Sequence, residues 1–318
     1  MSSLSAKSAV LIVAPLPSFL AEPLSAAYSC HDYFHAADKT ALLGECGTRV
    51  QAIVMAGGTV LNEPLMNALP SLKIISVFGV GYDGVPLKYC RDRGICLTNT
   101  PDVLTEDVAD TALALVLMTA RKLAEANRFL HAEKWPQGAF ELGTTLGGKR
   151  AGIFGLGRIG KAIARRLLGC GMEIGYHGRS NQPSEPYPFF PTLNQLAGWA
   201  DFLIVSCPGG TETRHVVNAE VLHSLGRQGT LINIARGSIV DEAALIDALQ
   251  NGVIKTAALD VFEHEPQVPA ELMARNNVVL LPHVGSATDE TRQAMADLVL
   301  RNLSAHFAGK PLVTPVPL

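Results

Sequence analysis

Short runs of almost entirely apolar residues recur along the whole chain, and a helical pattern separates each run from the next. In the first hundred residues the expected strands are 9–14, 52–56, 73–78 and 95–99. In the rest of the chain they are 151–154, 172–177, 202–208, 230–235, 256–262 and 278–283. Near-continuous apolar strands are typical of parallel sheets covered by helices on both faces. The pattern predicts an α/β protein with two doubly wound parallel-sheet domains and a ligand-binding cleft between them.

One segment departs from this rhythm, because residues 105–135 contain neither Gly nor Pro. Thr105, followed by Asp107 and an apolar run, indicates the start of a capped helix. We expect one long helix here, buried between domains or at a subunit contact. A later helix is expected from Thr288 to about Phe307, followed by an extended tail.

Composition narrows the class of protein. With 318 residues the chain has room for about two domains. Its 26 basic and 29 acidic residues give a net charge of −3, which argues against nucleic acid and membrane surfaces as partners. No apolar run approaches the ~20 residues of a membrane span. The six cysteines form no CxxC pair, which favours reduced thiols in a cytoplasmic protein.

A metal site is not expected. His31 and His35 are four residues apart, as metal ligands on a helix can be, but HDYFH is short, aromatic and without an acidic third ligand. Exposed or packed histidines are the better interpretation of this pair.

The strongest local motif is the GxGxxG sequence that begins at Gly155. It directly follows an expected strand and opens a helix, which is the context that a dinucleotide-binding turn requires. The residues of the turn are Gly155, Leu156, Gly157, Arg158, Ile159 and Gly160. The three glycines would permit a tight turn, let the backbone approach a pyrophosphate, and let helix and strand pack closely, while the helix N-terminus offers N–H groups to phosphates. A SAM-dependent methyltransferase is the main functional alternative.

The end of the next strand bears on the choice of cofactor. An NAD enzyme should carry Asp or Glu about 20 residues after the motif, to bond the ribose hydroxyls. This chain has Gly178, Arg179 and Ser180 instead, and a guanidinium with a hydroxyl suits a 2′-phosphate. The alternative is a solvated loop arginine. We expect NADPH or NADP as the preferred cofactor, with NAD as the other possibility.

Three charged or titratable residues follow late strands. Arg236 comes after 230–235, Glu265 comes after Asp260 and the strand 256–262, and His283 closes 278–283. Ligands of doubly wound sheets lie outside the carboxyl ends of the strands. Each residue alone has a structural explanation, as a salt-bridged arginine, a helix-start carboxylate or a satisfied histidine. Together, beside a dinucleotide motif, they form a candidate active site.

At these residues the chain resembles the D-isomer-specific 2-hydroxyacid dehydrogenases, over essentially its whole length. The matching segments, in family order, are GVGYD (79–83), GLGRIG (155–160), the run 231–242 that contains NIARGSIVDE, LDVFEHEP (259–266) and PHVGSAT (282–288). Within the family it most resembles the glyoxylate/hydroxypyruvate reductases, including the hydroxyphenylpyruvate reductases.

The resemblance implies a catalytic role for each late-strand residue. His283 is the expected acid/base, which protonates the carbonyl oxygen when a 2-keto acid is reduced. Glu265 would hydrogen-bond the imidazole, orient it and favour its protonated form. Arg236 would bind the substrate carboxylate and polarise the keto oxygen, a task suited to a forked, permanently charged donor.

The resemblance also implies binding residues. Backbone N–H groups of Val80 and Gly81 would hold the substrate carboxylate. The residues expected to bind the cofactor are Leu156 to Ile159 at the pyrophosphate, Gly178 to Ser180 at the adenosine ribose phosphate, Pro208 near the adenine, and Asp260 at the nicotinamide carboxamide, with the backbone of Ile234 and Ala235 nearby.

The family's architecture implies a discontinuous, flavodoxin-like substrate domain at 1–101 and 288–318. A Rossmann NAD(P)-binding domain is expected at 102–287, with a dimerisation helix and loop at about 105–145, and hence a homodimer. The expected reaction is NADPH-dependent reduction of glyoxylate or hydroxypyruvate to the D-2-hydroxy acid. Two alternatives stay open: a reductase for bulkier 2-keto acids, such as hydroxyphenylpyruvate or 2-keto sugar acids, and a dinucleotide-sensing, corepressor-like binding protein.

Overall fold

The computed structural model describes residues 7–318, and these divide into two compact units, each built around its own sheet. One unit contains the chain up to Leu104 and again from Thr288 to Leu318. The other contains Thr105–Ala287. The chain therefore leaves the first unit once and returns to it through its last helix.

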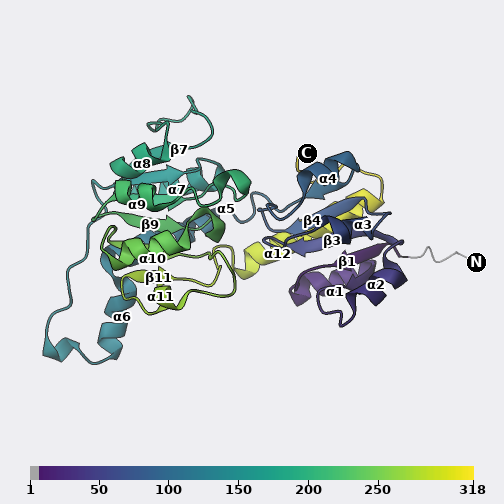
Figure 1. Ribbon diagram of the computed structural model, residues 1–318, viewed down its shortest axis with the longest axis horizontal. Helices are drawn as coiled ribbons and strands as arrows, with labels where there is room; N and C mark the ends of the chain where they lie inside the picture. The colour runs from purple at the N-terminus through teal and green to yellow at the C-terminus, as the bar shows by residue number, and fades with distance from the viewer. Residues whose placement is uncertain (1–6) are drawn as a thin grey trace, which may run out of the picture. The chain divides into compact units, whose positions relative to one another are not determined.

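The first unit is a five-stranded parallel sheet with helices around it (Figure 1). Its elements are β1 (Ala9–Ile12), α1 (Ser18–Ala27), β2 (Ser29–Asp32), α2 (Lys39–Cys46), β3 (Val50–Ala56), α3 (Glu63–Asn67), β4 (Ile74–Phe78), α4 (Leu87–Asp92), β5 (Cys96–Thr98) and α12 (Asp289–Phe307). The strand order β2-β1-β3-β4-β5 is the flavodoxin-like order. Helix α12 packs against β4 and α1, which brings the end of the chain back to this unit.

Strand β2 was not expected from the sequence. Its four residues, SCHD, are half-buried or exposed, so they lack the apolar run by which the other strands were identified. The strand lies at the edge of the sheet and pairs only with β1. His31 belongs to this strand, while the His35 ring bonds to Asp32 at 2.7 Å. Because it is an edge strand, β2 needs less apolar surface than its neighbours.

The second unit is a six-stranded parallel sheet with the strand order β11-β10-β9-β8-β6-β7 (Figure 1). Its elements are α5 (Thr105–Arg121), α6 (Leu123–His131), the 3-10 turn η1 (Trp135–Gln137), β6 (Arg150–Phe154), α7 (Arg158–Gly169), β7 (Glu173–His177), α8 (Leu193–Trp199), β8 (Phe202–Val205), η2 (Thr211–Thr213), α9 (Ala219–Leu225), β9 (Thr230–Asn233), η3 (Gly237–Ile239), α10 (Glu242–Gln250), β10 (Thr256–Leu259), α11 (Ala270–Met273) and β11 (Val278–Leu280). The order reverses direction between β6 and β8, which is where doubly wound sheets bind ligands. The prediction of two doubly wound parallel sheets is confirmed.

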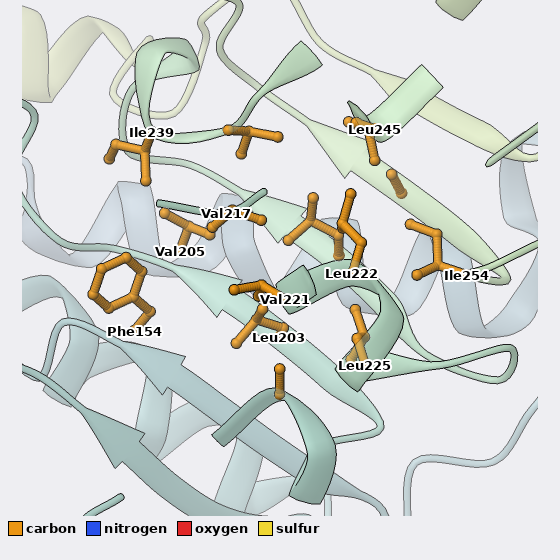
Figure 2. Close-up of a cluster of buried hydrophobic side chains, with 14 of the residues drawn as sticks. Phe154, Leu203, Val205, Val217, Val221, Leu222, Leu225, Ile239, Leu245 and Ile254 are labelled. Carbon is orange, nitrogen blue, oxygen red and sulfur yellow. The ribbon is translucent and has the colours of Figure 1, made fainter. Parts of the chain in front are cut away.

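Both faces of this second sheet are buried. Leu203 and Val205 belong to one apolar cluster, together with residues of α8, α9 and α10 (Figure 2). Ile204 lies between them, is equally buried and lies outside that cluster. Successive side chains of a strand point to opposite faces, so Ile204 faces the other side of the sheet. Helix α5 packs against β9, β10 and β11, and α7 against β6 and β7.

The long helix expected over 105–135 is wrong in one respect, because the chain forms two helices instead of one. Lys122 separates α5 from α6 and adopts a left-handed conformation with φ +53°. Its ammonium group pairs with Glu141, a contact 19 residues away in sequence. A left-handed lysine costs conformational energy, and no Gly or Pro marks the break, so a purely local pattern could not reveal it.

Several strands of the second unit end earlier than their apolar runs predict. Strand β8 ends at Val205, β10 at Leu259 and β11 at Leu280. Some of the apolar residues beyond these ends, such as Cys207 and Phe262, are buried in loops. Among the described residues, no helix is both long and apolar enough to cross a membrane.

Candidate active site

The predicted residues of the second unit all follow the carboxyl ends of its strands. The glycine turn follows β6, Gly178 to Ser180 follow β7, and Pro208 follows β8. Ile234, Ala235 and Arg236 follow β9, Asp260 and Glu265 follow β10, and His283 follows β11. The strands are parallel, so these ends lie along one edge of the sheet, where ligands bind in this fold.

Two of the three glycines in the turn after β6 are required by close contacts within the chain, and the third lies open. Gly155 has φ +102°, and a Cβ there would lie 2.5 Å from the Cys207 backbone nitrogen. A Cβ on Gly160 would lie 2.2 Å from the Gly155 carbonyl oxygen, so this position permits the close approach of helix and strand. Gly157 is different, because a Cβ there would meet nothing within 4 Å. Its bare backbone therefore faces open space, as close approach of a pyrophosphate requires.

The first turn of α7 presents uncapped backbone N–H groups at the same place. Gly157 is the N-cap of α7, and no side chain caps that end. The helix begins at Arg158 and continues through Ile159, while Leu156 is buried beneath the turn. Uncapped N–H groups and the positive end of the helix dipole form an anion site. The residues present therefore fit a dinucleotide.

Cys207 packs against the glycine turn. Cys207 is buried, with 7% of its surface exposed, and its backbone lies directly against Gly155. Burial raises the pKa of this thiol to about 12. Ser206, next to it, donates a hydrogen bond of 2.8 Å to the Gly155 carbonyl oxygen. Pro208 is exposed at the end of this segment and accepts a bond from the Thr213 hydroxyl at 2.9 Å.

The chain that leaves β7 carries a basic residue and a hydroxyl. Arg179 and Ser180 are exposed, and Gly178 is half-buried. No carboxylate occurs between the end of β7 and Asn181. The ring of His177, the last residue of the strand, stacks on Phe154, and its backbone carbonyl accepts the Gly155 N–H at 2.9 Å. The arginine and the glycine turn are thus on adjacent, directly bonded segments.

His283 and Glu265 form a close pair. His283 Nδ1 lies 2.7 Å from Glu265 Oε2, and the two side chains are 42% and 34% exposed. Glu265 Oε1 accepts the Phe262 N–H at 3.0 Å, so both of its oxygens are held. Partial burial raises the pKa of Glu265, but the bond and charge of His283, the Phe262 N–H and the charge of Arg236 outweigh this and lower it. The carboxylate therefore stays ionised at neutral pH.

Arg236 is held in a tight turn directly after β9. Buried Asn233 accepts the Ala235 N–H at 3.1 Å and donates to the Arg236 carbonyl oxygen at 2.9 Å. The guanidinium donates to the Ala235 carbonyl oxygen at 2.6 Å and is half-buried. Ile234 lies buried in the same turn. The positive charge of Arg236 also helps to lower the pKa of Glu265, so the two charged groups attract each other.

Asp260 holds the loop that carries His283. The carboxylate is almost fully buried and accepts the N–H groups of Val284 and Gly285 at 2.7 and 2.8 Å. The His283 N–H bonds to the Asp260 carbonyl oxygen at 2.8 Å, and His283 itself is left-handed, with φ +53°. Burial raises the pKa of Asp260, and the two N–H bonds and the His283 charge offset part of that rise. The sequence suggested a cofactor contact for Asp260 and gave no sign of this anchoring contact.

Two further residues that support the site were missed by sequence reasoning. A Cβ on Gly237 would lie 1.8 Å from the Phe262 carbonyl carbon, so the chain after Arg236 runs directly against the loop that carries Glu265. Glu242, at the start of α10, is buried and accepts the Glu263 N–H at 2.8 Å. Burial raises the pKa of this carboxyl. Both residues lie in the segment ARGSIVDE (235–242). A glycine and an acidic residue so close to Arg236 were the only features of the sequence that could have pointed to these two positions.

Glu263, in the loop that carries Glu265, is held by two side chains from another segment. It pairs with Arg214 at 2.7 Å and with the His215 ring at 2.8 Å, and its side chain is only 10% exposed. Burial raises the pKa of Glu263, but the bonds and charges of His215 and Arg214 outweigh this and lower it.

Val80 and Gly81 belong to the first unit, in the loop after β4. Gly79, before them, has φ +155° and packs against Gly57. The Val80 carbonyl oxygen accepts a hydrogen bond from the Asn99 side-chain amide at 2.8 Å. Val80 and Gly81 are both half-buried. In the described part of the chain, no three His, Cys, Asp or Glu side chains gather as a metal site would require.

Comparison with known proteins identifies the family. The model for the D-isomer specific 2-hydroxyacid dehydrogenase, NAD binding domain, matches residues 113–285. The glyoxylate/hydroxypyruvate reductase A HPR2 of Arabidopsis thaliana is 48% identical over 307 residues, which cover 96% of this chain and 98% of that protein. The hydroxyphenylpyruvate reductase of Plectranthus scutellarioides is 45% identical over the same shares of both chains.

A solved structure matches nearly the whole chain. It is the NADPH-dependent glyoxylate/hydroxypyruvate reductase SMc04462 (SmGhrB) of Sinorhizobium meliloti, in complex with NADP and malonate. The identity is 47% and the TM-score 0.92, over 98% of this chain and 97% of that one. Together with the glycine turn and the basic and acidic residues at the strand ends, these matches establish that the chain belongs to the D-isomer-specific 2-hydroxyacid dehydrogenases and is an oxidoreductase with a nicotinamide-dinucleotide-binding domain.

Proposed function

We propose that this protein reduces small 2-keto acids, glyoxylate or hydroxypyruvate, to D-2-hydroxy acids with NADPH. The observation that carries the proposal is the 2.7 Å pair of His283 and Glu265, which follow β11 and β10, with Arg236 directly after the neighbouring strand β9. An acid/base and a permanent cation placed together suit the reduction of a carbonyl next to a carboxylate. Relatives at 48% and 47% identity are named for this activity.

Each side chain has a distinct task in this reaction. Bound NADPH supplies the hydride that reaches the carbonyl carbon. Glu265 holds Nδ1 of His283, so Nε2 is the nitrogen that can donate a proton to the carbonyl oxygen. Arg236 binds the carboxylate and polarises the keto oxygen, where negative charge develops. Hydride addition at the carbonyl carbon and proton transfer from His283 to the carbonyl oxygen would together convert the keto group into the hydroxyl group of the product.

Each unit carries its own proposed binding residues. In the unit that spans Thr105–Ala287, the glycine turn takes the pyrophosphate and Pro208 lies at the adenine. The nicotinamide end belongs to Asp260 and the backbone of Ile234 and Ala235. In the other unit, the N–H groups of Val80 and Gly81 are the donors to the substrate carboxylate.

The preference for NADPH rests on the chain after β7. Arg179 and Ser180 are exposed there, no acid stands among residues 177–180, and a carboxylate would be needed for the ribose hydroxyls of NADH. A guanidinium can bind a 2′-phosphate through two parallel hydrogen bonds. The related reductase solved with NADP supports this preference.

A substrate panel tests the proposal. The purified protein is mixed with NADPH or NADH and with glyoxylate, hydroxypyruvate, 4-hydroxyphenylpyruvate or a 2-keto sugar acid, and the loss of reduced-nicotinamide absorbance is followed. The proposal expects the highest kcat/KM with the two small acids and NADPH. Tight NADPH binding without turnover of any acid would contradict it and favour a dinucleotide-sensing protein.

A second candidate is the reduction of bulkier 2-keto acids. The hydroxyphenylpyruvate reductase relative, at 45% identity, favours it. Tyr82 follows the Val80–Gly81 loop and packs on the core of the first unit. A higher kcat/KM with 4-hydroxyphenylpyruvate than with glyoxylate in the same panel would support this candidate.

The active form is proposed to be a homodimer. Segment 123–142 carries four exposed apolar side chains, namely Leu123, Leu130, Trp135 and Leu142, with exposed fractions of 47%, 56%, 67% and 93%. Helix α6 has no buried residue. Exposed apolar area of this kind is typical of a protein contact. Light scattering should give twice the mass of the chain, and the double variant L130E/W135E should give the mass of one chain; a monomeric native protein would contradict the proposal.

A further inference from the structure

The loop after β7 folds back onto the strand it has just left. This segment, residues 178–190, is named the β7 loop (Figure 1). Tyr176 donates its N–H to the Pro188 carbonyl oxygen at 3.0 Å and accepts the Phe190 N–H at 2.8 Å. The His177 ring bonds to the Phe190 carbonyl oxygen at 2.8 Å. The end of the loop is thus fixed beside its beginning, where Arg179 and Ser180 lie.

One buried hydroxyl organises the start of the loop. The Tyr176 side chain is 0% exposed. Its hydroxyl donates to Asn181 Oδ1 at 2.9 Å and accepts the Gln182 N–H at 2.6 Å. The phenol hydroxyl therefore acts as both donor and acceptor, and its two partners are the residues that directly follow Ser180.

Two side chains then join the loop to the glycine turn. Gln182 Nε2 donates to the Leu156 carbonyl oxygen at 2.9 Å, and Leu156 is the second residue of the GLGRIG turn. Glu185 pairs with Lys161, near the start of α7, at 2.7 Å, and the Glu185 side chain is 19% exposed. The loop is therefore attached to the strand below it, to the turn and to the helix beside it.

We propose that these contacts fix the position of Arg179 and Ser180 relative to the glycine turn, and that Tyr176 and Gln182 thereby determine selectivity for NADPH over NADH. The 2′-phosphate and the pyrophosphate are covalently joined in NADPH, so both can be bound at once only if their two protein sites keep a fixed spacing. NADH lacks the 2′-phosphate and is insensitive to that spacing. Tyr176 and Gln182 act through Arg179 and are positioning residues. This inference rests on the proposed NADPH preference.

The first test is Tyr176→Phe, which removes one buried hydroxyl and leaves the ring in place. Dissociation constants of NADPH and NADH are measured by nucleotide fluorescence on the purified protein, without substrate. We expect the NADPH constant to rise about 5- to 20-fold, because the Gln182 N–H loses its buried partner, and the NADH constant to change less than about twofold. Tyr187→Phe is the matched control, since Tyr187 is a half-buried tyrosine of the same loop, and it should leave both constants unchanged.

A double variant tests whether Tyr176 acts by positioning Arg179 or whether its loss disturbs the protein as a whole. If Tyr176 acts through Arg179, adding Tyr176→Phe to Arg179→Ala should produce no further loss of NADPH affinity. Additive losses, or equal losses for NADH and NADPH, would overturn the inference. Gln182→Met provides a second route, because it removes only the bond to the Leu156 carbonyl at a partly exposed position. It should reduce selectivity in the same direction.

The same dissociation constants test the NADPH preference and the positioning role of Tyr176 and Gln182 separately. A native protein that binds NADPH and NADH equally, and an Arg179→Ala variant that changes neither constant, would refute the NADPH preference and the inference with it. A native protein that prefers NADPH through Arg179, while Tyr176→Phe and Gln182→Met keep full selectivity, would refute the inference alone.

Discussion

His283 Nδ1 and Glu265 Oε2 lie 2.7 Å apart, although the two residues are 18 positions apart in sequence and follow different strands. The loop of Glu265 is held by Gly237 and Glu242, and the loop of His283 is held by Asp260. The pair is therefore fixed from both sides before any ligand is present. Groups that are already in position need no rearrangement when charge develops in the reaction.

Replacing His283 by Ala should lower kcat with 2-keto acids about 10²- to 10⁴-fold, the usual contribution of a positioned acid/base. NADPH affinity should change little, because the glycine turn is untouched. His223→Ala is a matched control, since the His223 ring is exposed and bonds to the Ala219 carbonyl of its own helix at 2.7 Å. Steady-state kinetics check both variants, and a His283→Ala enzyme with native turnover would remove the residue from the mechanism.

Replacing Arg236 by Lys keeps the positive charge but removes the planar fork of donors. We expect kcat/KM for glyoxylate to fall about 10- to 100-fold, the weight of one hydrogen bond to a charged group. Both kcat and KM should move, since the carboxylate is bound and the keto oxygen polarised by the same group. Kinetics identical to those of the native enzyme would contradict this role.

Replacing Gly237 by Ala should be both destabilising and inactivating. The new Cβ would lie 1.8 Å from the Phe262 carbonyl carbon, so the loop that carries Glu265 must move. Overpacking of this kind costs about 1–3 kcal/mol or more. Gly44→Ala, in helix α2, is the control, because a Cβ there meets nothing within 4 Å. Denaturant unfolding and steady-state kinetics would contradict the prediction if the two variants behaved alike.

The ion pairs of Glu263 should make stability depend on acid pH. Its pKa in the folded protein is lowered by His215 and Arg214 against the opposing effect of burial. A lowered folded pKa means that the stabilisation is complete above the ordinary carboxyl pKa of ~4.3 and is lost as pH falls through the lowered value.

Glu263→Gln should accordingly lose less unfolding free energy than the native protein as the pH is taken from about 6 to about 3. Urea unfolding across this pH range is the measurement. Glu212→Gln, at an exposed position in η2, serves as control. Parallel stability curves for the native protein and Glu263→Gln would show that the pairs contribute nothing.

Much of the fold was accessible from the sequence, because apolar runs and glycines act locally. The strand of residues 151–154 followed by Gly155, Gly157 and Gly160 predicts its own turn, and the structure has β6, a turn and α7 there. Strand β2 and the break at Lys122 were not accessible. The first is too polar to be recognised, and the second falls at a left-handed lysine that no Gly or Pro marks in the sequence.

Part of the candidate site could likewise be predicted from the sequence, and part could not. The position of Arg236, Glu265 and His283 after consecutive strands predicted that they share one sheet edge, and the structure brings Glu265 to His283. Their catalytic roles stay a prediction. The supporting contacts of Asp260 and Glu242 could not be predicted, because each is a side chain bonded to backbone N–H groups more than twenty residues away.

Cys207 lies against Gly155, in the glycine turn after β6, and burial raises its pKa to about 12. Peroxides and alkylating agents attack thiolates, so a sulfur that stays protonated offers them no nucleophile. Oxidative stress should therefore spare the nucleotide turn, and dyes or cross-linkers aimed at cysteines should react first with the half-buried Cys170 and Cys96. Site-directed labelling of the native protein can thus proceed without blocking the cofactor.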